Sequence, residues 1–132
     1  MVVDSSALVA IIKREPGHQW LSERMRAASL RRICAPTCLE STMVLDGRAF
    51  ASVGIVSRTL LELRIQVASF TPEMADRAAH AWRRYGKGQH PAKLNFGDCC
   101  TYALAEDLGM PILCTGDDFA QKDLPVLRPP GS

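Results

Sequence analysis

Short apolar runs that alternate with helix-like stretches constrain the fold of this chain more than any other feature. Strand-like runs are expected at residues 1–3, 31–35, 65–70, 111–114 and 126–127. Helical patterns fill the segments between them. Because strands that alternate with helices are typical of parallel sheets, we predict an α/β fold with a mainly parallel central sheet flanked by helices. Ligands of such sheets bind beyond the carboxyl ends of the strands.

The expected helices are marked by capping and turn residues. Thr71 and Pro72 form a typical helix start, and Gly86 is expected to end that helix. Another helix, over residues 7–13, is expected to be capped by Ser5 and Ser6. Further helices are expected from Pro16 through Met25, over residues 37–48, from Gly54 through Leu63 and over residues 97–105.

The length of 132 residues and the 47% hydrophobic content predict one domain with its own core, over residues 1–128, followed by a tail at 129–132. The first residues lack the basic and apolar regions of a signal peptide, and no apolar run is long enough to span a membrane. The five cysteines are therefore expected to be reduced, in a cytoplasmic protein. The net charge of +2 neither indicates nor excludes a nucleic-acid partner.

Acidic residues stand at or just after the expected strand ends. Asp4 ends the first strand, and Glu40 lies in the early turns of the helix after the second strand. Asp98 opens a later helix, and Asp117 and Asp118 follow the strand at 111–114. In a parallel sheet these carboxylates would point into one crevice at the same edge.

Crowded carboxylates raise one another's pKa, and a hard divalent cation removes that cost. Mg²⁺ and Mn²⁺ prefer oxygen ligands, and such an ion can activate water and neutralise a phosphoryl oxygen. The chemistry that fits this pattern is hydrolysis of a phosphodiester. Each acid also has a structural interpretation: Asp4 and Asp98 as helix caps, Glu40 as a buried side chain, and Asp117 and Asp118 as turn residues.

Four segments of the chain carry a family resemblance. They are Val2–Leu8, Ala35–Glu40, His90–Cys99 with Tyr102–Ala105, and Leu113–Phe119. In order, spacing and total length, the chain closely resembles the PIN-domain ribonucleases, specifically the VapC toxins of bacterial toxin–antitoxin pairs. The resemblance covers nearly the whole chain.

The resemblance implies a five-stranded parallel sheet and an endoribonuclease, dependent on Mg²⁺ or Mn²⁺, that cleaves cellular RNA. It also implies a cognate antitoxin that blocks the site, and a homodimer. Carried over by motif, the acidic quartet and metal ligands are Asp4, Glu40, Asp98 and Asp117, and Ser6 and Thr115 are the polar residues that support them. Asp118, next to Asp117, leaves the identity of the fourth acid open.

Cations near the acids are candidates for binding RNA phosphates. The expected loop before Asp98 supplies Lys87, His90 and Lys93, and Arg14 follows the first helix. An ordinary solvated surface is the alternative interpretation of these residues.

Two other classes of protein also fit parts of the pattern. A metal-dependent phosphatase uses acids at strand ends, but a haloacid-dehalogenase-type enzyme has a second acid two residues after the first, where this chain has Ser6. A non-catalytic RNA- or protein-binding module on the same fold would be expected to have lost acids, and all four positions are filled. A zinc site at Cys34 and Cys38 lacks a second pair of ligands at zinc spacing.

Overall fold

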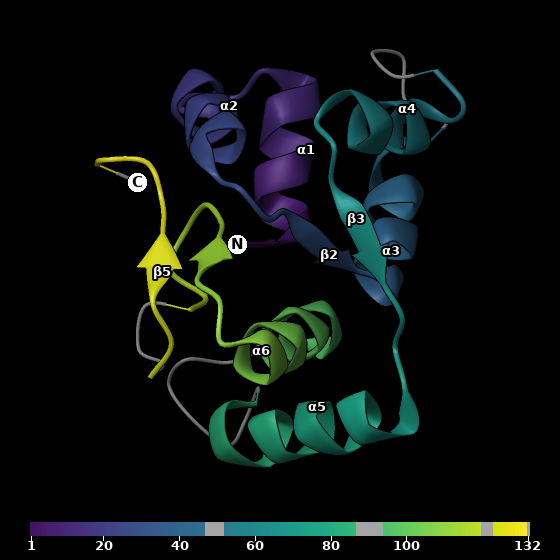
Figure 1. The fold of residues 1–132 in the computed structure, drawn as a ribbon, viewed down its shortest axis with the longest axis vertical. Helices are drawn as coiled ribbons and strands as arrows, with labels where there is room; N and C mark the ends of the chain where they lie inside the picture. Colours follow the sequence, from purple (N-terminus) through teal and green to yellow (C-terminus); the bar gives the residue numbers. More distant parts are fainter. Residues whose placement is uncertain (47–51, 87–93, 120–122, 132) are drawn as a thin grey trace.

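A five-stranded parallel sheet forms the centre of the molecule, in the order β3-β2-β1-β4-β5 (Figure 1). The computed structural model describes residues 1–46, 52–86, 94–119 and 123–131. The strands are β1 (Val2–Val3), β2 (Arg32–Cys34), β3 (Gln66–Ala68), β4 (Ile112–Leu113) and β5 (Val126–Leu127). The predicted α/β class is confirmed, and all pairings between neighbouring strands are parallel.

Helices cover both faces of this sheet (Figure 1). They are α1 (Ser5–Lys13), α2 (His18–Ala27), α3 (Ala35–Leu45), α4 (Ile55–Glu62), α5 (Pro72–Tyr85) and α6 (Phe96–Leu108). Because side chains alternate along a strand, Val2 packs into the core under α5 and α6, whereas Val3 packs into the core under α1 and α2. Leu21 and Met25 are fully buried and Trp20 packs against the same core.

Several boundaries differ from the sequence prediction, among them α2, which begins at His18, and α3, which begins at Ala35. Three of the differences have clear local reasons. The first helix begins at Ser5, two residues early, because the Asp4 side chain caps it by accepting from the Ser6 amide. The α6 helix begins at Phe96, because Asn95 rather than Asp98 is its N-cap. Pro129, in the expected tail, is buried, and a Cβ on Gly17 would lie 2.9 Å from its Cγ, so this proline packs against the body of the domain.

All five cysteines are free thiols. Burial raises the pKa of Cys34 to about 11 and the pKa values of Cys100 and Cys114 to about 12, so these thiols stay protonated. Within the part of the chain that the structure describes, no helix is both long and apolar enough to cross a bilayer.

Candidate active site

The predicted acids lie at the carboxyl ends of the central strands. Asp4 directly follows β1, and its backbone amide donates to the Leu113 carbonyl of β4 at 2.9 Å. Glu40 lies in the second turn of α3, which begins directly after β2. Asp98 lies in the first turn of α6, which packs on β1, β2 and β4. The parallel order β2-β1-β4 therefore assembles residues that are far apart in the chain.

Asp4 is the most deeply buried acid of the group, at 3% exposure. Three donors hold its carboxylate. The Thr101 hydroxyl donates to Oδ1 at 2.9 Å, and the amide and hydroxyl of Ser6 donate to Oδ2 at 3.1 and 2.6 Å. Burial raises the pKa of Asp4, these hydrogen bonds oppose the rise, and the nearby charge of Asp118 adds to it.

Ser6 and Thr115 connect Asp4 to the turn after β4. The Thr115 backbone amide donates to the Ser6 hydroxyl oxygen at 3.1 Å, while that hydroxyl donates to Asp4. Ser6 therefore touches an acid directly, and Thr115 contributes through its main chain. On the other side of Asp4, the Thr101 hydroxyl lies 3.4 Å from the hydroxyl of buried Thr37, which extends the polar network into α3.

Asp98 is held by a capping box at the start of α6. Asn95 Oδ1 accepts from the Asp98 amide at 2.9 Å, and Asp98 Oδ2 accepts from the Asn95 amide at 3.1 Å. Its exposure is 6%. Burial raises the pKa of Asp98 to about 7, against the hydrogen bond from Asn95, and the charges of Asp4, Asp118 and Glu40 raise it further.

Glu40 is half-buried and lies against the first turn of α6. Burial raises its pKa, a hydrogen bond with the Ser5 side chain opposes the rise, and the charge of Asp4 adds to it. Its carboxyl group occupies the space beside the Gly97 Cα where a side chain would begin. Glu40 thus lies between Ser5, which follows Asp4, and Gly97, which precedes Asp98.

The two acids after β4 have different surroundings. The Asp117 side chain is 84% exposed and forms an ion pair with Arg128, which also donates to the Gly116 carbonyl at 3.1 Å. Asp118 instead acts electrostatically on both Asp4 and Asp98. The structure therefore brings Asp4 and Asp98 within electrostatic reach of Asp118, whereas the described contacts of Asp117 are with Arg128.

Among the described residues, no cation forms an ion pair with Asp4, Glu40 or Asp98. The ion pairs of the described residues involve other carboxylates, at Glu15, Glu106, Asp107, Asp117 and Asp123. In these same parts of the chain, no three His, Cys, Asp or Glu side chains already converge on one metal position. The donors themselves fit a hard divalent cation, because they are carboxylate oxygens that are buried, mutually repelling and hydrogen-bonded only to neutral groups.

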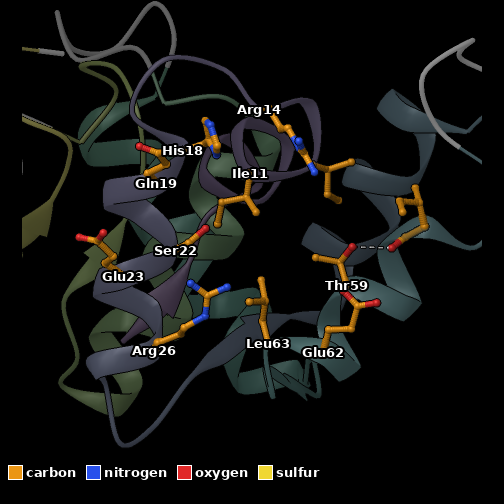
Figure 2. A pocket seen from close by; sticks show the side chains of 12 residues that line it. Ile11, Arg14, His18, Gln19, Ser22, Glu23, Arg26, Thr59, Glu62 and Leu63 are labelled. Carbon is orange, nitrogen blue, oxygen red and sulfur yellow. Dashed lines mark hydrogen bonds between the residues drawn. The ribbon is translucent and has the colours of Figure 1, made fainter.

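The predicted RNA-binding cations are divided between two regions. Lys87, His90 and Lys93 lie outside the described residues. Arg14 lies at the far end of α1 from Asp4, and a helix of that length, nine residues, spans about 13 Å. Figure 2 shows Arg14 at the rim of a hollow between α1, α2 and α4, which Ile11, His18, Glu23, Arg26 and Glu62 also line. Arg14 therefore does not lie at the edge of the sheet that carries the acids.

Three residues with clear roles in this site were missed by the sequence prediction. Thr101 follows Asp98 by three positions on the same helix, so helical spacing could have placed the two side chains on one face. The Asn95 cap could have been found from its spacing to Asp98. Arg128 had no sequence signal, because it reaches Asp117 only through the pairing of β5 with β4.

Residues 1–124 match the PIN domain family. The chain is also 40% identical over 126 residues to "Ribonuclease VapC42" of Mycobacterium tuberculosis, covering 94% of this chain and 96% of that protein. It is 42% identical over 130 residues to "Ribonuclease VapC36" of the same species, covering 94% and 91% of the two chains. The chain therefore belongs to the PIN-domain family and, within it, to the VapC ribonucleases, which confirms the resemblance seen in the sequence.

Solved structures show the same fold. The crystal structure of Mycobacterium tuberculosis VapC20, described as a sarcin-ricin loop cleaving toxin, matches with a TM-score of 0.76 at 16% identity, over 97% of this chain and 98% of that one. A toxin–antitoxin complex from Klebsiella pneumoniae matches with a TM-score of 0.69 at 17% identity, over 96% and 94% of the two chains.

Proposed function

We propose that this chain is the toxin of a toxin–antitoxin pair and a divalent-metal-dependent endoribonuclease acting at the acidic site. The observation that carries the proposal is the pair of buried carboxylates, Asp4 and Asp98, at the carboxyl ends of the central strands, which no cation among the described residues pairs with. Keeping such charges together is costly unless a cation binds there. The relatives named as VapC ribonucleases support RNA as the substrate.

In this proposal Asp4 and Asp98 are the principal ligands of Mg²⁺ or Mn²⁺. When bound, the ion would lower the pKa of a water molecule and neutralise charge on a phosphoryl oxygen. Thr101 and Ser6 fix the two oxygens of Asp4, and Asn95 fixes Asp98, so both carboxylates keep their orientation before RNA arrives. Glu40 orients the attacking water and accepts its proton, a role that its raised pKa favours.

Asp118 is our proposed fourth acid, in place of Asp117. It is the acid of the turn whose charge reaches Asp4 and Asp98, whereas Arg128 holds Asp117 at the surface. Both residues are exposed, so the proposal depends on the charge of Asp118 acting on the site and on the pairing of Asp117 with Arg128.

The deciding experiment is cleavage of a labelled structured RNA by the purified protein with Mg²⁺, with Mn²⁺ and with EDTA. We expect cleavage that requires metal and falls at least about 100-fold in Asp4→Asn and in Asp98→Asn. Asp76→Asn, an exposed acid of α5, is the matched control and should cut as wild type does. Cleavage that persists in EDTA, or in both site variants, would contradict the proposal.

The same assay separates the alternatives. A folded wild type that binds several RNAs without cutting any of them would favour the non-catalytic binding module on this fold. Release of phosphate from small monoesters, with intact RNA, would favour the metal-dependent phosphatase.

Replacement of Lys87 and Lys93 by Ala should weaken RNA binding and flatten its salt dependence if these cations contact phosphates.

A cognate antitoxin that blocks the site is the proposed partner, supported by the structural match to a toxin–antitoxin complex. We expect the protein encoded beside this chain to co-purify with it and to suppress cleavage in proportion to the amount added. Full cleavage in a stable complex of the two proteins would contradict a blocking role. The domain at 1–128 and a cytoplasmic location remain part of this proposal.

We also propose a homodimer, formed through the apolar surface beside the acids. Leu39, Met43 and Phe96 are exposed around a hollow of about 970 Å³ that Glu40 and Gly97 also line. Exposed apolar patches of this kind mark protein interfaces. Sedimentation should show a dimer for wild type and a monomer for Met43→Glu, and a monomeric wild type would contradict this assembly.

A further inference from the structure

The backbone of α6 does not require a glycine at position 97. Gly97 is not among the glycines with a positive φ, unlike Gly17, Gly54, Gly109 and Gly116. Inside a helix, alanine is favoured over glycine because it restricts the unfolded chain more. The reason for a residue without a side chain at this position must therefore lie in its surroundings.

Those surroundings are the carboxyl group of Glu40. A Cβ built on Gly97 would lie 2.6 Å from both Cδ and Oε1 of Glu40, and closer still to Oε2. These separations are far below van der Waals contact, so the carboxyl group occupies the place of the absent side chain. Glu40 comes from α3 and Gly97 from α6, so the contact joins two helices at the acidic site.

This contact determines where the Glu40 carboxyl group can lie. The Ser5 side chain forms a hydrogen bond with it, and the bare first turn of α6 lies against it. Since Asp98 follows Gly97 directly, the same turn sets the position of Glu40 relative to Asp98. We infer that Gly97 is a positioning residue for Glu40, resting on the proposed nuclease function: its missing side chain lets this carboxylate approach the site.

Gly97→Ala is a clean test because the clash involves the flexible end of a side chain. The new methyl group can be accommodated by rotation of Glu40, with no movement of backbone or core. We expect a melting temperature equal to or above that of wild type. We expect kcat for RNA cleavage to fall on the order of 100-fold, with little change in KM, because the reacting groups are misplaced rather than lost.

A second background shows whether the effect acts through Glu40. Glu40→Asp shortens the side chain by one methylene and leaves room for the added methyl group. Gly97→Ala should therefore change kcat less than about threefold when introduced into Glu40→Asp. An equal fold-loss in both backgrounds would overturn the inference. Glu73→Ala, an exposed residue at the same position of α5, controls for changes in a first helical turn and should leave kcat unchanged.

A crystallographic comparison without metal or RNA gives a readout that does not depend on activity. The Gly97→Ala structure should show Glu40 rotated away from α6 with Asp98 and Asn95 in place. A Glu40 that stays in place beside the new methyl group would overturn the inference, even if cleavage falls. If wild type cuts no RNA, the nuclease proposal fails, whereas this comparison still decides the contact.

Discussion

The acids at the two ends of α6 have opposite surroundings. At the amino end, Asp98 is buried, is bound by backbone and amide groups, and has a pKa raised to about 7. At the carboxyl end, Glu106 is half-buried and Asp107 is exposed, and both form ion pairs with Arg77 of α5. The helix dipole favours acids at the amino end and disfavours them at the carboxyl end. The acids at the carboxyl end are therefore neutralised by the protein, whereas Asp98 at the amino end is oriented by neutral groups and, in our proposal, is balanced by a metal ion.

The carboxylates of the acidic site are held in fixed orientations at a cost to the stability of the fold. Neutral donors fix the direction of the Asp4 and Asp98 carboxylates, and among the described residues no cation forms an ion pair with either. Surface ion pairs such as those of Arg77 contribute little to stability and are screened by salt. Substitutions at the two ends of α6 should consequently change the free energy of unfolding by different amounts and in opposite directions.

The largest effect is expected for Asp98→Asn in the metal-free protein. Because the folded pKa of Asp98, about 7, exceeds its ordinary 3.8, the folded protein binds an extra proton between these values. Wild-type stability should therefore be fullest below about pH 4 and be lost as the pH rises through about 7. Asparagine has no charge to bury and keeps an acceptor for Asn95. At pH 8 the variant should be more stable by up to about 4 kcal/mol.

Urea denaturation in EDTA at pH 4, 5.5 and 8 measures this difference. Asp107→Asn at the other end of α6 is the matched control and should change stability by less than about 1 kcal/mol at each pH. A variant Asp98→Asn that is less stable than wild type at pH 8 would show that the buried charge does not oppose folding.

Loss of the hydroxyl that fixes Asp4 should come next in size. Thr101→Val keeps the volume of the side chain and removes its donor to Asp4 Oδ1. The expected loss of stability is about 1.5–3 kcal/mol, because a hydrogen bond to a buried charged group disappears. Thr59→Val is the control, since the Thr59 hydroxyl donates only to the Ile55 carbonyl within its own helix. Equal losses of stability for the two variants in denaturant titrations would show that the hydrogen bond to Asp4 contributes no more than one within a helix.

The two acids after β4 provide a smaller but sharper comparison. Asp118→Asn should lower kcat about tenfold, which corresponds to about 1.4 kcal/mol. Asp117→Asn should lower it less than about threefold, because that side chain is exposed and paired with Arg128. Single-turnover cleavage of one labelled RNA measures both variants. The opposite order would restore Asp117 as the fourth acid.

The smallest effect is expected at the surface end of α6. Arg77→Ala removes the partner of both Glu106 and Asp107, yet all three side chains are partly solvated. The expected loss of stability is below about 1 kcal/mol, and it should vanish at high salt. Thermal melts at low and high ionic strength provide the check. A larger, salt-independent loss would mean that the two ends of α6 are less different than described above.

The fold and the location of the site were predictable because both depend on periodicity. Strand ends in a parallel sheet meet at one edge, and the expected helix starts near that edge place Glu40 and Asp98 close to Asp4. The helix-capping role of Asn95 and the facing position of Thr101 were also accessible from spacing, although neither was predicted. These features are local, so a reading of neighbouring residues can reach them.

The remaining details depend on contacts between distant segments. Our proposal of Asp118 in place of Asp117 depends on the turn at Gly116, with a φ of 77°, and on Arg128, which follows β5 and donates to the Gly116 carbonyl. The contact of Glu40 with Gly97 joins positions more than fifty residues apart. Arg14 was expected near RNA, and the direction of α1 carries it away from the acids.

The central position of β1 also has a consequence for synthesis of the protein. Val2 and Val3 are made long before β4, yet β1 pairs with β4, and the Asp4 amide finds its acceptor only at Leu113. Chains grow from the amino end at about 5–20 residues per second, so several seconds of translation pass before that partner exists. A nascent chain carries Asp4 and Glu40 long before it can assemble them with Asp98. The topology thus keeps the acidic site unassembled until the segment that carries Asp98 and β4 has been made.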